Sequence, residues 1–120
     1  MKTILVDHEV LASLYGDCHE CLNEVFTEFL SGYESMKQDL SSAFASGNLF
    51  SLKRLLHFYG PSYMYLGMPG MSDRFKNLEH KCAQEGNHFV LSAEFAELIE
   101  LVQKSYNEVL SRTESLKKAV

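Results

Sequence analysis

The sequence predicts an all-α protein, and three observations lead to that prediction. Apolar residues recur every three or four positions over long stretches, which is the spacing of one face of an α-helix. The 120-residue chain has only two prolines, Pro61 and Pro69, and few β-branched residues. Short glycine-containing or polar segments separate the periodic stretches. We therefore expect an antiparallel up-down-up-down four-helix bundle with a short additional N-terminal helix, formed by residues 1–120 as a single domain.

The first two predicted helices differ greatly in length. The short one spans residues 7–15, with Asp7 as its N-cap. The long one begins after Asp17, its expected N-cap, and runs to about Ser46, where Gly47 is expected to end it in a left-handed conformation. The apolar stripe of the long helix comprises Cys18, Leu22, Val25, Phe26, Phe29, Tyr33, Met36, Leu40 and Phe44.

The second half of the chain contains three more predicted helices. They cover residues 48–66, then a segment from about Ser72 to Glu85, then about 91–118; the Gly-Met-Pro-Gly turn at 67–70 separates the first two. Their predicted buried residues are Leu52, Leu55, Tyr59, Ser62 and Leu66, then Met71, Phe75, Leu78 and Cys82, and finally Phe95, Leu98, Val102, Tyr106 and Val109.

His57 lies almost opposite the buried stripe of its helix, so we expect its side chain on the outer surface. Its lateral neighbours on that helix are Lys53, Arg54, Gly60, Pro61, Met64 and Met68. Cations and residues with little or no side chain around a histidine suit an imidazole that another molecule must reach. From spacing alone, however, a surface histidine without any function remains an open alternative.

The charge and hydropathy of the chain exclude several classes of function. The formal net charge is −5, whereas generic nucleic-acid binding requires a basic surface. No apolar stretch approaches the roughly 20 residues that a membrane-spanning helix needs. The apolar run at the N-terminus is too short for a signal peptide. We therefore expect a cytoplasmic protein that binds neither nucleic acid nor membranes.

Two of the three cysteines, Cys18 and Cys21, have the C-x-x-C spacing found in many metal and redox sites. No second pair of this kind follows that could complete a zinc site. Residues three positions apart share one face of a helix, so we expect reduced thiols that pack as small core residues. A helical module with a Cys/His metal site remains the alternative, and metal analysis of the purified protein would then find stoichiometric zinc.

The segment that follows His57 has Ser62 five residues after the histidine, Gly67 ten residues after it, and the pair Leu78 and Glu79 at 21 and 22 residues. This spacing resembles that of the histidine phosphotransfer (HPt) domain of two-component phosphorelays. In that family the active histidine is often followed by a serine five residues later, a glycine ten residues later, and a Leu-Glu or similar pair about 21 and 22 residues later. Residues 26–30 and 43–48 also resemble the family's long second helix and the turn after it, so the resemblance extends over essentially the whole chain.

Two positions depart from the family pattern. Gly60 stands where the family has a lysine that offsets the phosphoryl charge, and Pro61 stands where it has a glycine that leaves room for the partner. Gly60 would supply room but no charge. Pro61 has no amide to bond the His57 carbonyl, so the helix is expected to kink or loosen just after the histidine. Lys53 and Arg54, one turn before His57, are the candidate replacement cations.

The resemblance implies a histidine phosphotransfer protein that acts as a phosphotransfer intermediate rather than an independent kinase. His57 would accept a phosphoryl group from a receiver aspartate or a kinase and pass it to a receiver domain, and Glu79 would orient the imidazole. The implied partners are a response regulator receiver domain, a sensor histidine kinase, or both. The chain would need no metal or cofactor, since Mg²⁺ is expected on the receiver. Met64, Tyr65 and Met68 would form an apolar rim for the partner, beside Gly60 and Pro61.

The missing lysine also favours a second interpretation within the same family. A degenerate phosphotransfer-like adaptor would bind a receiver or a kinase without stable phosphorylation. The presence of His57 favours a working phosphotransfer protein over an adaptor, and Gly60 favours the adaptor. Phosphorylated receiver domains distinguish the two, because only the working protein takes up their phosphoryl group.

Overall fold

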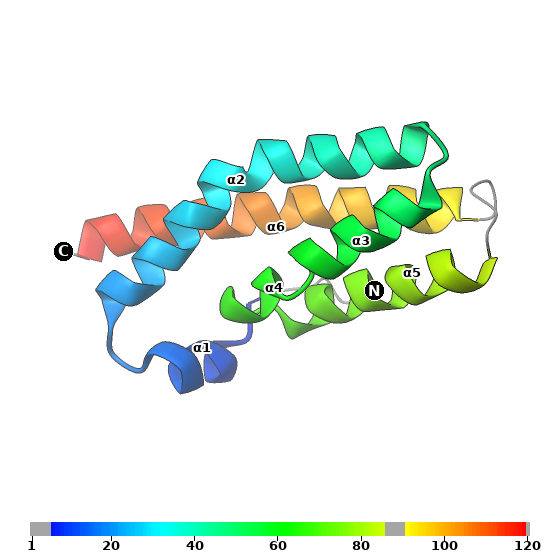
Figure 1. Ribbon diagram of the computed structural model, residues 1–120. Helices are drawn as coiled ribbons and strands as arrows, with labels where there is room; N and C mark the ends of the chain where they lie inside the picture. Colours follow the sequence, from blue (N-terminus) through cyan, green and yellow to red (C-terminus); the bar gives the residue numbers. More distant parts are fainter. Residues whose placement is uncertain (1–5, 86–90, 120) are drawn as a thin grey trace.

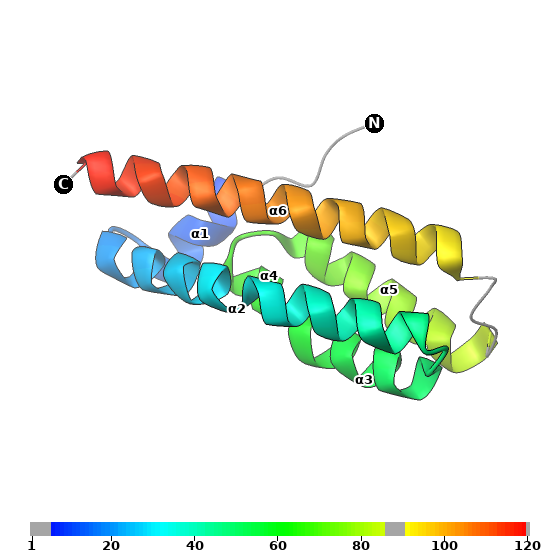
Figure 2. The same ribbon diagram turned by 90° about the horizontal axis from the view of Figure 1, so that it is seen from above.

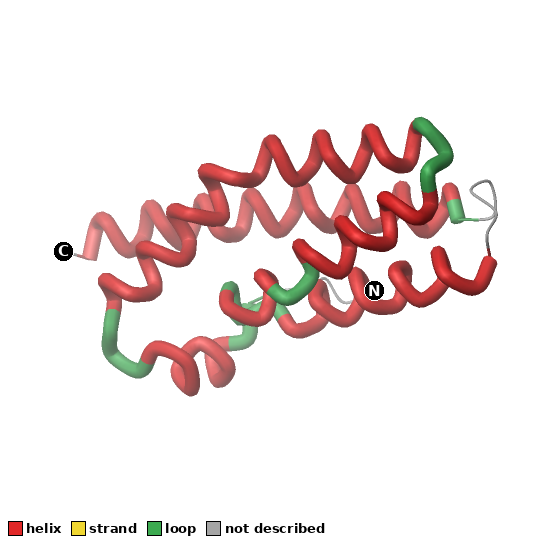
Figure 3. Tube along the Cα trace, viewed as in Figure 1, coloured by secondary structure: helices red, strands yellow, loops and turns green. Residues whose placement is uncertain are grey.

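Helices make up nearly all of the chain in the computed structural model, which describes residues 6–85 and 91–119 (Figure 1). In order they are α1 (His8–Tyr15), α2 (His19–Ala45), α3 (Leu49–Tyr59), α4 (Ser62–Tyr65), α5 (Pro69–Glu85) and α6 (Ser92–Ala119). No strand occurs within the described ranges (Figure 3). The predicted all-α class is therefore confirmed.

The longer helices pack side by side as a helical bundle. Helices α2, α3, α5 and α6 run in alternating directions along the long axis of the molecule, which measures 48 × 25 × 24 Å (Figures 1 and 2). The most extensive packing is between α3 and α5, followed by α2 with α6 and α2 with α3. As a result, the helix that carries His57 lies between α5 on one side and α2 on the other.

One contiguous apolar core lies between these helices. The stripe predicted for α5 is buried throughout, and so is the stripe of α6 apart from the half-buried Tyr106. Fully burying one leucine, valine, methionine or phenylalanine side chain stabilises the fold by about 1.5–3 kcal/mol. The largest fully buried side chains are Tyr63, Phe26, Phe75, Leu40, Leu52, Leu56, Leu66, Met68, Met71, Leu91, Val102 and Val109.

Local capping explains where the first helices begin and end. Asp7 caps α1 as predicted, because its Oδ1 accepts hydrogen bonds from the amides of Glu9 and Val10. Gly47 has a φ of +74° after α2, and the amides of Gly47 and Asn48 donate back to the last turn of that helix. The prediction of Asp17 as the N-cap of α2 is wrong, since Cys18 holds that position.

The predicted continuous helix over residues 48–66 is also wrong, although the expected disturbance after His57 is confirmed. Pro61 has no amide, and the next amides bond three residues back instead of four: Tyr63 donates to the Gly60 carbonyl at 3.1 Å. The shift changes the register of the residues that follow. Tyr63 is consequently buried where Ser62 was predicted, and Ser62 is exposed.

Before the break, the buried face of α3 is also slightly rotated from the prediction. Leu52 and Leu56 are fully buried, whereas Leu55 and Tyr59 are only half-buried. Packing of α3 against both α5 and α2 centres the buried stripe between these neighbours. The rotation leaves His57 on the outer side, as predicted.

The turn after α4 fixes the position of α1. Gly67 has a φ of +74°, and a Cβ atom there would lie 2.7 Å from Leu11 Cγ, so only glycine fits. The Asp7 amide donates to the Gly67 carbonyl, and the Tyr15 hydroxyl donates to the Tyr65 carbonyl at 2.7 Å. Helix α5 then starts at Pro69 instead of near Ser72, because proline suits the first position of a helix.

Within the described residues, no helix combines the length and the apolar character that crossing a bilayer requires.

Candidate functional site

His57 lies on the outer face of α3, close to α5. Helix α3 starts at Asn48, whose side-chain oxygen accepts a hydrogen bond from the Ser51 amide at 3.0 Å. Burial of Leu52 and Leu56 then sets the rotation of the helix about its axis. The side chain of His57 is consequently 77% exposed, and another molecule can reach it.

Glu79 of α5 contacts the His57 ring. Its Oε2 lies 3.1 Å from Nδ1 of His57, and its side chain is only 16% exposed. The core residues Phe75, Leu78 and Cys82 anchor α5 on both sides of this glutamate. Two residues that are 22 positions apart in the sequence are thereby brought together by the packing of α3 on α5.

This contact defines the chemistry of the imidazole. A carboxylate accepts hydrogen bonds but has no proton to give, so this contact favours the tautomer with the proton on Nδ1. In the neutral ring, Nε2 then has a free lone pair. An imidazole held in this way can act as a nucleophile, with the carboxylate as the group that orients it.

The two candidate cations differ in their accessibility. Arg54 is exposed, and its guanidinium lies 5.9 Å from the centre of the Phe50 ring. Lys53 is half-buried. Neither forms an ion pair with a carboxylate among the residues that the structure describes. Among the described residues, no hydrogen bond or ion pair joins either cation to the His57 ring.

Gly60 does not provide the open space expected from the sequence. The residue is buried, and a Cβ atom on it would lie 3.0 Å from Phe75 Cβ of α5. A contact this short with an atom fixed to the backbone cannot be relieved by turning a side chain. Gly60 is therefore a close-packing position between α3 and α5, and its assignment to the partner-binding surface is wrong.

The predicted apolar rim is only partly present. Met64 and Tyr65 are exposed, as is Pro61, and these three residues remain candidates for partner contact. Met68 is completely buried in the core, so its assignment to the rim is wrong. The reason is the turn at Gly67, which directs the chain from the surface back into the bundle before α5 begins.

Two exposed aromatic residues near His57 were missed in the sequence. Phe50 and Phe58 are 68% and 71% exposed, although phenylalanine is usually buried. They lie seven residues before and one residue after His57, and together with Arg54 they occupy the outer face of α3. The helical spacing that placed His57 outside would also have placed these two rings there.

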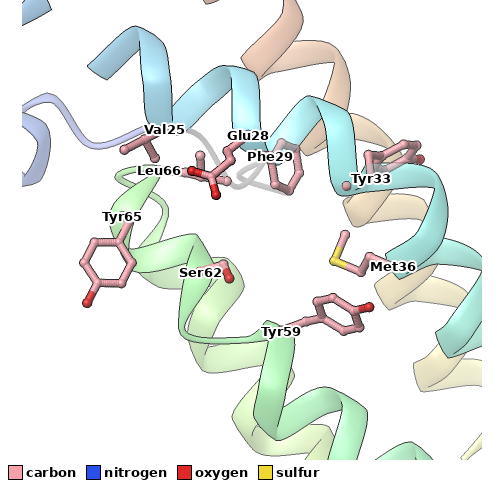
Figure 4. Close-up of a pocket in the computed structure, with 10 residues that line it drawn as sticks. Val25, Glu28, Phe29, Tyr33, Met36, Tyr59, Ser62, Tyr65 and Leu66 are labelled. Atoms are coloured by element: carbon pink, nitrogen blue, oxygen red, sulfur yellow. The ribbon is translucent and has the colours of Figure 1, made fainter. Parts of the chain in front are cut away.

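A separate pocket lies on the other side of α3, facing α2 (Figure 4). Its volume is about 350 Å³, and Figure 4 shows the carboxylate of Glu28 and the hydroxyl of Ser62 among apolar and aromatic side chains. The Tyr59 hydroxyl there donates to Asp39 at 2.9 Å; burial, together with this hydrogen bond, raises the pKa of Tyr59. His57 and Glu79 do not line this pocket.

The expectation of buried, reduced cysteines at positions 18 and 21 is wrong. Cys18 and Cys21 are both exposed and are joined by a disulfide. The first turn of α2, where they lie, projects beyond the core, and Leu22 is the first residue of this helix to pack against it. In the part of the chain that the structure describes, no three His, Cys, Asp or Glu side chains are grouped closely enough to hold a metal ion.

Comparisons with protein-family models, with curated proteins and with solved structures find no match to this chain.

Proposed function

We propose that the protein is a histidine phosphotransfer protein of a two-component phosphorelay and that His57 is its phosphoacceptor. The observation that carries this proposal is the exposed His57 ring with its Nδ1 atom 3.1 Å from the half-buried carboxylate of Glu79. We further infer that α2, α3, α5 and α6 form an antiparallel four-helix bundle of the HPt type, with α1 as the additional N-terminal helix.

The proposed reaction uses the free lone pair of the imidazole. Nε2 of His57 attacks the phosphorus of an aspartyl phosphate on a receiver domain. The bond between phosphorus and the aspartate oxygen breaks, and its electron pair leaves with the aspartate carboxylate. The Nδ1 proton stays in its hydrogen bond to Glu79, which stabilises the positive charge that the ring gains. The reverse reaction transfers the phosphoryl group to the next receiver, and Mg²⁺ belongs to the receiver in both directions.

The surface around His57 supports transfer between proteins. Phe50, Phe58, Met64 and Tyr65 are all exposed large apolar side chains on α3 or α4. Exposed large apolar side chains on the helix that carries a reactive polar group, and on the helix that follows it, are typical of a surface that binds another protein. A receiver domain would cover these side chains while its aspartyl phosphate approaches the imidazole.

Phosphoryl transfer from receiver domains tests this function. The purified protein is incubated with a panel of receiver domains carrying ³²P-labelled aspartyl phosphate, and in parallel with phosphoramidate as a small phosphodonor. We expect one acid-labile, base-stable phosphoryl group per chain from at least one receiver. Binding of a receiver without any label on this chain, even from phosphoramidate, would overturn the proposal in favour of the adaptor, which the missing lysine at Gly60 favours.

The role of Glu79 can be tested with two substitutions. Glu79→Ala removes the acceptor for Nδ1–H, and we expect it to slow phosphoryl uptake by roughly 10- to 100-fold, the range found when the group that orients a metal-binding histidine is removed. Glu79→Gln keeps an oxygen acceptor and should retain most of the rate. Stopped-flow or quenched transfer assays measure the rate, and nitrogen chemical shifts of the His57 ring report the tautomer.

A matched control distinguishes loss of the group that orients His57 from loss of a negative charge anywhere on the surface. Glu100→Ala removes an exposed carboxylate from α6 and should not change the rate. If Glu79→Ala transfers as fast as Glu100→Ala and its ring keeps the proton on Nδ1, Glu79 does not orient the histidine.

Arg54 is an exposed cation one turn before His57 on the same helix, and we expect it to offset the phosphoryl charge. We expect Arg54→Ala to slow transfer and to shorten the lifetime of the phosphohistidine by up to about fivefold, the range of exposed ion pairs, because the phosphoryl group brings roughly two negative charges to the surface. Measurements at low and high salt should show the effect shrinking as salt is added. Lys104→Ala on α6 is the control, and an equal effect of the two substitutions would exclude a local role for Arg54.

A further inference from the structure

The disulfide between Cys18 and Cys21 is located at the N-terminus of α2, away from the core. Cys18 is the N-cap residue, and its sulfur accepts a hydrogen bond from the Cys21 amide at 3.2 Å. Both residues are exposed, so a reagent can reach either sulfur. The third cysteine, Cys82, is a buried free thiol, and burial together with the nearby carboxylate of Glu79 raises its pKa.

The disulfide between Cys18 and Cys21 is poorly suited to stabilising the fold. The two cysteines are three positions apart at the start of one helix, so the bond connects no two elements of the fold. A disulfide that closes so short a loop restricts the unfolded chain only slightly. Neither residue contributes to the core. Disulfides that are exposed in this way belong to the class that is readily exchanged.

The helix end makes one of the two sulfurs the better nucleophile. In the reduced protein, a Cys18 thiolate would accept the Cys21 amide hydrogen and would lie at the positive end of the dipole of a 27-residue helix. Asp17 and Glu20 add negative charge at the same helix end. These carboxylates oppose a thiolate. The thiolate at Cys18 is therefore favoured by the backbone at the helix end and not by a cationic side chain.

We propose that Cys18 and Cys21 form a reversible thiol–disulfide exchange site for small disulfides and thiols of the glutathione type. The Cys18 thiolate attacks one sulfur of the small disulfide, forming a mixed disulfide and releasing one small thiol. The Cys21 thiolate then attacks the Cys18 sulfur, which releases the second small thiol and closes the Cys18–Cys21 bond. Two electrons and the two cysteine protons pass to the small disulfide. This site is distinct from the proposed phosphotransfer function and does not depend on it.

Equilibration in glutathione buffers tests the proposal on the whole folded protein. Samples are held at graded ratios of glutathione to its disulfide, free thiols are trapped with a maleimide, and the added mass is read per peptide. We expect Cys18 and Cys21 to become labelled together as the ratio rises, while Cys82 reacts only after unfolding. A pair that stays oxidised at every ratio, or reduced at every ratio, would overturn the proposal.

Single substitutions test the order of attack. Cys21→Ser should accumulate a mixed disulfide of Cys18 with glutathione, because no second thiol is left to displace it. Cys18→Ser should form the corresponding adduct on Cys21 at least about tenfold more slowly, since a thiol at the N-cap gains most from the helix end. Equal rates would overturn the assignment of Cys18 as the nucleophile. Cys82→Ala, checked for helical circular dichroism, should leave the exchange of Cys18 and Cys21 unchanged.

Discussion

Replacing His57 with glutamine is expected to abolish phosphoryl uptake from every competent donor without unfolding the protein. Glutamine cannot form the nitrogen–phosphorus bond, because its amide nitrogen has no available lone pair. The side chain of His57 is 77% exposed and contributes little to packing, so the free energy of unfolding should stay within about 0.5 kcal/mol of its original value. Urea unfolding followed by circular dichroism and label uptake from the same preparation measure both quantities.

His80→Gln is the matched control for this experiment. His80 is also an exposed histidine, and it directly follows Glu79 on α5, the helix that packs against α3. Labelling of His80→Gln should equal that of the unchanged protein. Acid-labile phosphate on the His57→Gln protein would instead show that another side chain is the acceptor.

The parts of the fold that periodicity determines were predictable from the sequence. Met71, Phe75 and Leu78 are buried as predicted because α5 is a regular helix, whose spacing of 3.6 residues per turn holds along the whole stripe. Asp7 and Gly47 were also predictable, because capping depends on residues that are close in sequence. Ser62 was placed wrongly because Pro61 changes the hydrogen-bond register within the predicted helix.

The location of the candidate site on the surface of α3 was predictable from the sequence. The contact between its two side chains was not. The spacing of α3 placed His57 on the outside, and the resemblance to HPt domains singled out Glu79. The 3.1 Å approach of their side chains depends on how α3 lies against α5, which no local pattern contains. The same packing of α3 on α5 buries Gly60 against Phe75. The sequence alone had suggested open space at this position.

Gly60→Lys would introduce the lysine that is typical of the HPt family at this position, yet we expect it to destabilise this protein by about 2–4 kcal/mol. The new Cβ atom would lie 3.0 Å from Phe75 Cβ, so α3 and α5 would have to separate. Overpacking of this kind costs about 1–3 kcal/mol, and partial burial of the terminal ammonium group would add to that cost. The higher helix propensity of lysine returns less than about 1 kcal/mol.

Gly32→Lys is the matched control, because it introduces the same side chain at a position without close neighbours. Gly32 lies within α2, and a Cβ atom there has no neighbour within 4 Å, so the substitution should stabilise the protein by about 0.5–1 kcal/mol. Urea unfolding of both variants measures the difference, and transfer assays should show no gain in phosphorylation for Gly60→Lys. If Gly60→Lys were as stable as Gly32→Lys and took up phosphoryl groups faster, position 60 would have the family's charge-offsetting role, and the close packing of Gly60 against Phe75 would not limit it.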